Sequence, residues 1–227
     1  MELTMFERLL HLPLFQGLST QELSDVMAHI RLDFINYQAG DEIVTQGEPC
    51  RGLLYIISGT VASEYTDSGK RFVLQEKLPQ MGLLEPYNMF GMYQKYSRTY
   101  CFDSDGSTLY VDRKTTLQRL IQHDIVKINL LNIISNRYQQ TLKLLCEAPD
   151  YTIKEQIVKF ISSYVAIPKG EKELRIKMTE LANIIHATRL KVSQALNEMQ
   201  DEGLIALQRE TIIIPDFQEL RQSIRTV

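Results

Sequence analysis

The sequence is poor in cysteine and has no long apolar run. Its three cysteines, Cys50, Cys101 and Cys146, are odd in number and widely spaced, which argues against a disulfide framework and against a zinc knuckle. The apolar stretches are much shorter than a membrane span, and the N-terminal sequence MELTMFERLL lacks the apolar core and cleavage site of a signal peptide. These absences predict a cytoplasmic protein without a membrane segment.

Motifs of catalysis and metal binding are also missing. The chain has no G-x-x-x-x-G-K-[ST] loop, no H-E-x-x-H pair and no nucleophile elbow. No histidine has a partner at a spacing typical of metal ligands. We therefore expect neither an enzyme nor a metal site.

The sequence has no excess of positive charge. The formal net charge is -3, and from residue 150 onward eleven lysines and arginines are balanced by eleven aspartates and glutamates. A protein that coats nucleic acid without sequence preference would be more basic, because phosphate neutralisation supplies that affinity. Any DNA-binding surface must therefore be local.

What the chain does contain is a pattern of two short helices at residues 178–203. Thr179 is the expected N-cap of the first helix. The second is expected to begin at Thr188 and to end before Gly203. Its buried stripe, at the i, i+4, i+7 spacing, is Val192, Leu196 and Met199. A tight turn between such helices is typical of a helix-turn-helix.

The other positions of the second helix carry side chains suited to DNA. Arg189 can donate two hydrogen bonds to a guanine, and Ser193 and Gln194 can read neighbouring bases. Lys191 and Thr188 are expected on phosphates. The alternative is a helical hairpin with a solvated charged face.

A wing is expected directly after these helices. Residues 204–207 and 211–214 are short apolar runs that predict a hairpin around Arg209. Arg209 would supply a phosphate contact, together with Arg175 and Lys177 on the approach.

The first half of the chain reads as two helices followed by short strands. Helical periodicity covers residues 2–12 and 19–30, and Ser19 with Glu22 forms a capping box. The expected strands are 31–37, 42–44, 53–57, 60–66, 71–77 and 108–112. This series predicts a small antiparallel barrel or jelly roll.

Both halves resemble the Crp/Fnr family of bacterial transcription regulators. In the C-terminal half the resemblance is carried by Glu180-Leu181-Ala182, Thr188-Arg189, Val192-Ser193, Leu196, Gly203-Leu204-Ile205 and Ile214. In the N-terminal half it is carried by Tyr37, Gly40, Ile43, Gly47, the run LYIISGTV at 54–61 and Phe90-Gly91.

The resemblance implies an α+β fold in three parts. These are an N-terminal cyclic-nucleotide-binding-like β-barrel or jelly roll, a long dimerisation helix, and a C-terminal winged helix-turn-helix. It also implies double-stranded DNA and RNA polymerase as partners. The family frequently has a glutamate where this chain has Leu190. A leucine cannot accept a hydrogen bond from the amino group of a cytosine, but it can touch the methyl group of a thymine. A different operator is therefore expected.

The resemblance also locates an effector pocket, with a departure. Met92 stands where nucleotide-binding members have a ribose-binding glutamate, whereas Arg98 and Thr99 lie where those members grip the phosphate. Gln139 and Gln140 lie where family members read the adenine. A methionine would leave a ribose hydroxyl unpaired, at about 1–3 kcal/mol. Cyclic AMP is therefore not the expected effector.

Methionines and aromatic residues crowd residues 79–101. Met89 and Met92 among them could line a haem or another planar ligand, with ordinary core packing as the alternative. Some family members hold an iron-sulfur cluster on closely spaced N-terminal cysteines. The first cysteine here is Cys50, so no such cluster is expected.

The longest helical pattern runs from 124 to 147 and ends near Pro149, a predicted hinge. After the hinge, Thr152 with Glu155 forms a capping box for a helix expected to reach Ile167. Its two apolar seams would pack on the helix's own barrel and on a twin helix, and a helix buried wholly in its own subunit is the alternative. One seam is Leu131, Ser135, Tyr138, Leu142 and Leu145. The expected domains are a sensor at 1–123, the dimerisation helix at 124–147 and the DNA-binding domain at 148–227.

These patterns predict a homodimeric, sequence-specific transcription regulator on a palindromic operator, modulated by a small effector in the barrel. Two alternatives within the family stay open: a constitutive member with an empty pocket, and a haem- or gas-sensing member. A scaffolding module whose helix-turn-helix binds no DNA is the alternative from another class.

Overall fold

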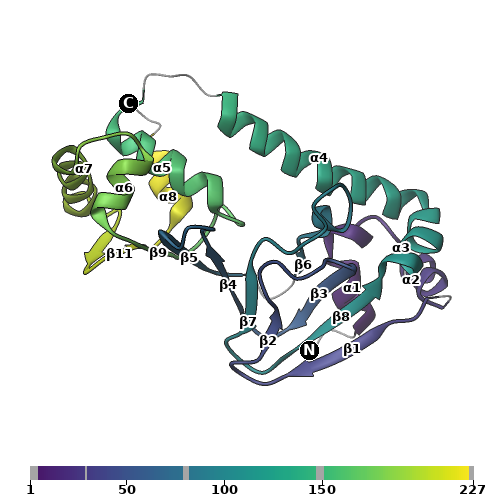
Figure 1. The fold of residues 1–227 in the computed structure, drawn as a ribbon. Helices are drawn as coiled ribbons and strands as arrows, with labels where there is room; N and C mark the ends of the chain where they lie inside the picture. Colours follow the sequence, from purple (N-terminus) through teal and green to yellow (C-terminus); the bar gives the residue numbers. More distant parts are fainter. Residues whose placement is uncertain (1–4, 29, 79–81, 147–150, 225–227) are drawn as a thin grey trace. The chain divides into compact units, whose positions relative to one another are not determined.

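The computed structural model describes residues 5–28, 30–78, 82–146 and 151–224. The chain packs as two compact units, which we call the N-terminal unit (residues 1–61 and 78–140) and the C-terminal unit (residues 62–77 and 141–227). Figure 1 follows the chain through their elements. A segment from the middle of the first half, residues 62–77, therefore packs with the C-terminal part of the chain. The domain boundaries drawn from the sequence stay a prediction.

The N-terminal unit begins with two short helices joined by a 3-10 turn. They are α1 (Met5–Leu10), η1 (Pro13–Phe15) and α2 (Thr20–Met27). The predicted capping box is confirmed: Ser19 N donates to Glu22 Oε2 at 2.8 Å, and Glu22 N donates to Ser19 Oγ at 3.2 Å. The reciprocal bonds satisfy donors that a helix start leaves open, so α2 begins where the sequence indicates.

The strands of this unit form antiparallel sheets that stay open within the described residues. Four strands pair in the order β1-β8-β3-β6, and β2 pairs with β7. Their bounds are β1 (Asp33–Tyr37), β2 (Glu42–Val44), β3 (Gly52–Ser58), β6 (Gly82–Leu84), β7 (Thr99–Phe102) and β8 (Gly106–Asp112). The jelly-roll form of the prediction is confirmed, and a closed barrel is not formed. The short β6 and β7 were not expected from the sequence.

Strand β3 is the centre of this core because its run of apolar residues is buried on both faces. Phe15 stacks on Tyr55 of β3, with ring centroids 5.9 Å apart. Gly59, just after β3, has a φ of 87°, and a Cβ there would lie 2.8 Å from Asp105 O. Only glycine fits this turn without strain.

Helical elements complete the N-terminal unit. They are η2 (Pro86–Met89), which lies between β6 and β7 in the chain, α3 (Arg113–Gln118), η3 (Leu120–Gln122) and α4 (Asp124–Cys146), of which the residues up to 140 belong to this unit. Helix α3 was not expected; Asp112 caps it by accepting a hydrogen bond from Thr115 N at 3.0 Å. Helix α4 confirms the predicted long helix to within one residue.

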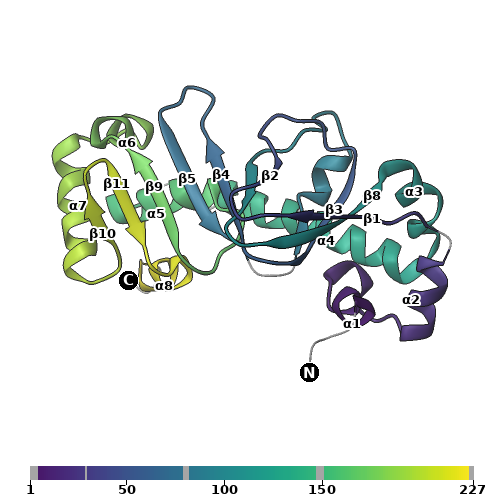
Figure 2. The same cartoon turned by 90° about the horizontal axis from the view of Figure 1, so that it is seen from below.

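The C-terminal unit is built on a sheet to which the first half of the chain contributes two strands. β4 (Val61–Thr66) and β5 (Phe72–Lys77) form a hairpin, and β5 pairs with β9 (Lys172–Ile176), which pairs with β11 (Thr211–Ile214) and then β10 (Ala206–Gln208). Figures 1 and 2 both show β5 beside β9. All these pairings are antiparallel, so the hairpin extends the sheet of the wing.

Helices cover this sheet around one apolar core. They are α5 (Ile153–Tyr164), α6 (Met178–Ile184), α7 (Arg189–Asp201) and α8 (Phe217–Ile224). Phe72 of the hairpin is buried and meets Phe160 and Tyr164 of α5 edge-on, with ring centroids 5.0 and 4.9 Å apart. Such aromatic pairs stabilise beyond their buried area. The hairpin is therefore part of the core of the C-terminal unit.

Candidate nucleic-acid interface

Helices α6 and α7 form the predicted helix-turn-helix, in the residues that the sequence indicated. The N-cap of α6 is Lys177, and it has no side-chain capping bond. The prediction of Thr179 as the N-cap is therefore wrong: the helix begins at Met178, and Thr179 lies in its first turn. The preceding strand β9 ends at Ile176, which leaves room for one residue before the helix.

The turn between the two helices is closed by backbone contacts. Ala187 N donates to Ala182 O at 2.9 Å, and His186 adopts a left-handed φ of 54°. Thr188 then caps α7, because its Oγ1 accepts a hydrogen bond from Lys191 N at 3.4 Å. The buried stripe of α7 is as predicted, with Ala195 added to Val192, Leu196 and Met199.

The outward face of α7 lies opposite this stripe. Leu190 is 68% exposed, and Gln194 and Asn197 are exposed at i+4 and i+7 from it, so the three share one line along the helix. Arg189 and Lys191 are exposed on either side of that line, and Ser193 is half-buried. The structure thus brings every predicted residue of α7 to one end of the helix. Asn197, at i+7 from Leu190, is exposed on the same line but was not among the residues predicted from the sequence.

The wing stands beside this face. Gln208 of β10 pairs with Thr211 of β11, so Arg209 and Glu210 alone close the hairpin, with Glu210 at a left-handed φ of 57°. Arg189 and Lys177 line a groove of about 310 Å³ together with the wing residues Gln208, Glu210 and Thr211. The predicted base-reading arginine therefore shares a groove with the wing.

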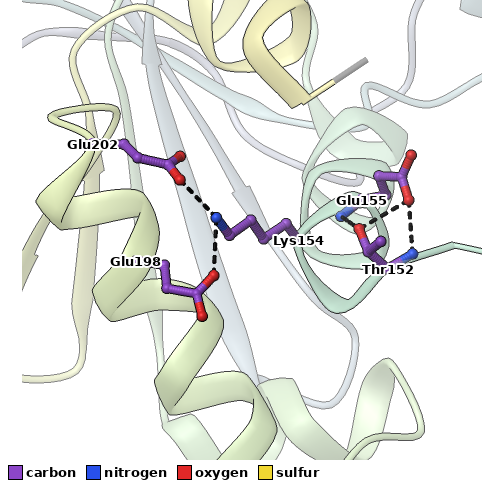
Figure 3. A network of polar contacts seen from close by, with 5 residues as sticks. All are labelled: Thr152, Lys154, Glu155, Glu198 and Glu202. Carbon is purple, nitrogen blue, oxygen red and sulfur yellow. Dashed lines mark hydrogen bonds and ion pairs between the residues drawn. The ribbon is translucent and has the colours of Figure 1, made fainter. Parts of the chain in front are cut away.

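A network of ion pairs holds the other end of α7. Lys154 of α5 lies between Glu202, the C-cap of α7, and Glu198 of α7, at 2.8 and 3.0 Å (Figure 3). The hydrogen bond from Lys154 to Glu202, then that to Glu198, raises the pKa of Lys154. Thr152 and Glu155 form the predicted capping box of α5, with Thr152 N donating to Glu155 Oε2 at 2.7 Å. Two acidic side chains of α7 are thus paired with α5, away from its basic N-terminal end.

The residues of the predicted effector pocket do not share one environment. Met89 is 0% exposed and packs in the core, whereas Met92, three residues later, is 92% exposed. Arg98 is buried, and Thr99 Oγ1 accepts a hydrogen bond from Gln46 N at 3.0 Å. The two methionines therefore do not line one cavity in this structure. Gln139 and Gln140 are exposed on α4.

A buried carboxylate organises this region instead. Glu85 is 4% exposed and accepts hydrogen bonds from Ser97 N at 2.7 Å, Tyr100 Oη at 2.8 Å and Asn88 Nδ2 at 2.5 Å. Burial, and then the charge of Glu85, raises the pKa of Tyr100. Glu85 has a left-handed φ of 39°, and no sequence pattern indicated its role.

An apolar stripe is exposed along α4. Ile128, Leu131, Tyr138 and Leu142 are large exposed side chains at heptad-like spacing, whereas Val126 and Leu130 are buried in the N-terminal unit. Of the two predicted seams, the one that contains Leu131, Tyr138 and Leu142 is therefore exposed, up to Leu142.

Within the described ranges, no three His, Cys, Asp or Glu side chains gather closely enough to hold a metal ion. Cys50 and Cys101 are free thiols, and burial raises the pKa of Cys50. No helix that the structure describes combines the length and apolarity needed to cross a membrane.

Comparison with known proteins bears on the C-terminal unit first. Residues 155–223 match the family model of the Crp-like helix-turn-helix domain. No curated protein matches the sequence.

Solved structures are similar over more of the chain. The catabolite activator protein of Thermus thermophilus is 21% identical, with 93% of this chain and 97% of that chain covered and a TM-score of 0.48. FixK2 of Bradyrhizobium japonicum is 16% identical, with 85% and 97% covered and a TM-score of 0.46. The sensor domain of the regulator DNR from Pseudomonas aeruginosa is 22% identical, with 63% and 94% covered and a TM-score of 0.48. These TM-scores are below 0.5, so the argument about function rests on the match of residues 155–223 to the domain model.

Proposed function

We propose that this chain, a DNA-binding transcription regulator of the Crp/Fnr type, acts as a homodimer on a palindromic operator. The observation that carries the proposal is the exposed N-terminal end of α7 beside the wing, inside the segment that matches the Crp-like helix-turn-helix domain. In a helix-turn-helix this end of the second helix enters the major groove.

The side chains of α7 have distinct roles in the proposal. Arg189 donates two hydrogen bonds to a guanine, and Ser193 and Gln194 contact neighbouring bases. Leu190, the most exposed apolar side chain of this helix, contacts a thymine methyl. Thr188 and Lys191, with Arg209 of the wing, bind phosphates.

The exposed stripe of α4 is the proposed dimer contact. Four large apolar side chains on one helix face are costly to leave in water, and the same face on a second copy can cover them. A two-fold dimer presents two α7 helices to successive major grooves, which is why the operator is expected to be palindromic.

The N-terminal unit is the proposed sensor. A small effector there would shift the balance between two states of the DNA-binding parts, and RNA polymerase is the expected partner on DNA. Cyclic AMP is not the proposed effector, because Met92 replaces the glutamate expected for the ribose. The alternatives are a constitutive regulator and a haem sensor; an absorption spectrum after haemin addition, beside calorimetry with cyclic AMP, separates them.

The operator sequence can be found in the same experiment that tests DNA binding. Random duplexes are selected on the full-length protein, and the affinity of the selected sequence is measured by fluorescence anisotropy. Arg189→Ala should weaken binding by about 1–3 kcal/mol and relax the preference at one base pair of each half-site. Lys169→Ala, which removes an exposed charge outside both α7 and the wing, is the control and should leave affinity unchanged.

Failure of the wild-type protein to select any duplex would refute the proposal. Equal affinity of wild type and Arg189→Ala for the selected sequence would refute the role of Arg189.

A further inference from the structure

Two grooves of the C-terminal unit share one wall. The first is the groove beside Arg189, and the second, of about 590 Å³, lies between the wing and the turn of the β4–β5 hairpin. The residues that line both are Ile176, Lys177, Glu210 and Thr211. The surface is therefore continuous from the N-terminal end of α7, past the wing, to the hairpin.

The second groove is strongly basic. Its lining side chains include five cations, against the two carboxylates Glu180 and Glu210. The cations are Lys70, Arg71, Arg175, Lys177 and Arg209. The excess of positive charge lies on the same surface as Arg189.

Two of these cations are already paired, and three are not. Arg71 Nε lies 2.8 Å from Asp67, and Arg175 Nε lies 2.8 Å from Glu173. Among the residues that the structure describes, Lys70, Lys177 and Arg209 have no carboxylate within ion-pair distance. Three exposed cations thus remain available to an anionic ligand.

The hairpin turn holds Lys70 in a fixed position. Lys70 N donates to Asp67 O at 2.8 Å, Gly69 N donates to Asp67 Oδ2 at 3.1 Å, and Asp67 N donates to Phe72 O at 3.2 Å. Phe72 is in turn anchored in the core. A backbone ordered in advance lowers the entropic cost of a contact made by its side chain.

We propose that this groove binds the sugar-phosphate backbone of duplex DNA flanking the bases that α7 reads, and that Lys70 contacts a phosphate there. The inference rests on the proposed function and extends the DNA-binding surface to a residue from the first half of the chain. A polyanion fits better than a small anion, because the cations come from the hairpin turn, the end of β9 and the wing, along two grooves that share a wall. The contact is made to phosphate, so it carries no base preference.

The test compares full-length proteins that differ at one lysine. Lys70→Asn removes the charge and tolerates the φ of 53°, and Lys70→Gly, which suits the same φ, is a second variant. Lys77→Asn is the matched control, because Lys77 lies in the same hairpin, outside the groove, near Glu171 at 3.6 Å. Affinity for the selected duplex and for an unrelated duplex is measured from about 50 to 200 mM salt.

Loss of one phosphate contact has a defined signature. For Lys70→Asn and Lys70→Gly, both duplexes should bind about fivefold to tenfold more weakly near 0.1 M salt, and the slope of log K against log salt should flatten by about 0.9. Lys77→Asn should match wild type. Wild-type affinity and slope in both Lys70 variants would overturn the inference, and a wild-type protein that binds no duplex would instead refute the proposed function.

Discussion

The most informative single perturbation is Glu76→Ala, which removes one member of a fully buried ion pair. Glu76 on β5 and Lys172 on β9 are directly paired in the strand register, with Lys172 Nζ 3.3 Å from Glu76 Oε2. Glu76 also accepts hydrogen bonds from Ala166 N at 2.8 Å and Ile167 N at 3.3 Å. The carboxylate thus joins the hairpin, the wing sheet and the chain that follows α5.

The expected loss of unfolding free energy is about 3–5 kcal/mol, the range found when one partner of a buried ion pair is removed. This range already includes the two backbone N–H groups that lose their acceptor, each of which costs about 1–3 kcal/mol, so their cost is not added to it. Replacing both charges, as in Glu76→Leu with Lys172→Met, should recover only part of the loss: neither buried charge then remains, but the N–H groups of Ala166 and Ile167 still lack an acceptor.

The assay is equilibrium urea unfolding by circular dichroism, with native-state hydrogen exchange of the β5 and β9 amides to isolate this unit. Lys77→Ala is the control: the next residue on the same strand, it forms only an exposed pair, 3.6 Å from Glu171, worth less than about 1 kcal/mol. If Glu76→Ala differs from wild type by no more than this control does, the pairing of β5 with β9 does not hold the unit together, and the reasoning fails.

Two further predictions concern the hairpin turn and α4. The hydrogen bond from Arg71 is the largest cause of the lowered pKa of Asp67. The contribution of the Asp67 carboxylate to stability is therefore present above the unfolded pKa of about 4 and is lost as the pH falls through the folded pKa. In urea unfolding below pH 4, Asp67→Asn should lose less unfolding free energy on acidification than wild type, and equal losses would contradict this. Leu131→Glu, on the exposed stripe, should shift the protein toward monomer in sedimentation equilibrium whereas Asn132→Glu beside it should not, and a dimer unaffected by Leu131→Glu would place the contact elsewhere.

Local signals explain what could be predicted from the sequence. The capping boxes at Ser19 and Thr152 are contacts between residues three apart, so the pattern contains the whole interaction. The buried stripe of α7 and the unbroken apolar run of β3 are likewise set by spacing alone. The capping prediction at Thr179 was wrong because this threonine, although chemically suited to an N-cap, lies two residues after the actual N-cap, Lys177.

Contacts distant in the sequence explain what could not be predicted. Periodicity shows that β5 has a buried face but not which strand lies beside it, and its partner β9 is about a hundred residues away. The same limit applies to Met89 and Met92: both are apolar, yet one is buried and the other exposed, because a turn of the backbone separates them. Composition alone does not resolve such a difference.

If Lys70 contacts DNA as proposed, the hairpin links DNA binding to the first half of the chain. Residues 62–77 continue directly from β3 of the N-terminal unit, yet they pack with the wing, and Lys70 lines the basic groove only while β5 pairs with β9. We call the hairpin docked when β5 pairs with β9 and undocked when this pairing is broken. If DNA binds the docked state more tightly than the undocked state, DNA must stabilise the docked state by the same free energy, since coupling is reciprocal. An effector could then change the affinity for DNA by no more than the difference between its own affinities for the docked and undocked states. Hydrogen exchange at β5 and β9 is therefore the measurement on which DNA and any candidate effector can be compared directly.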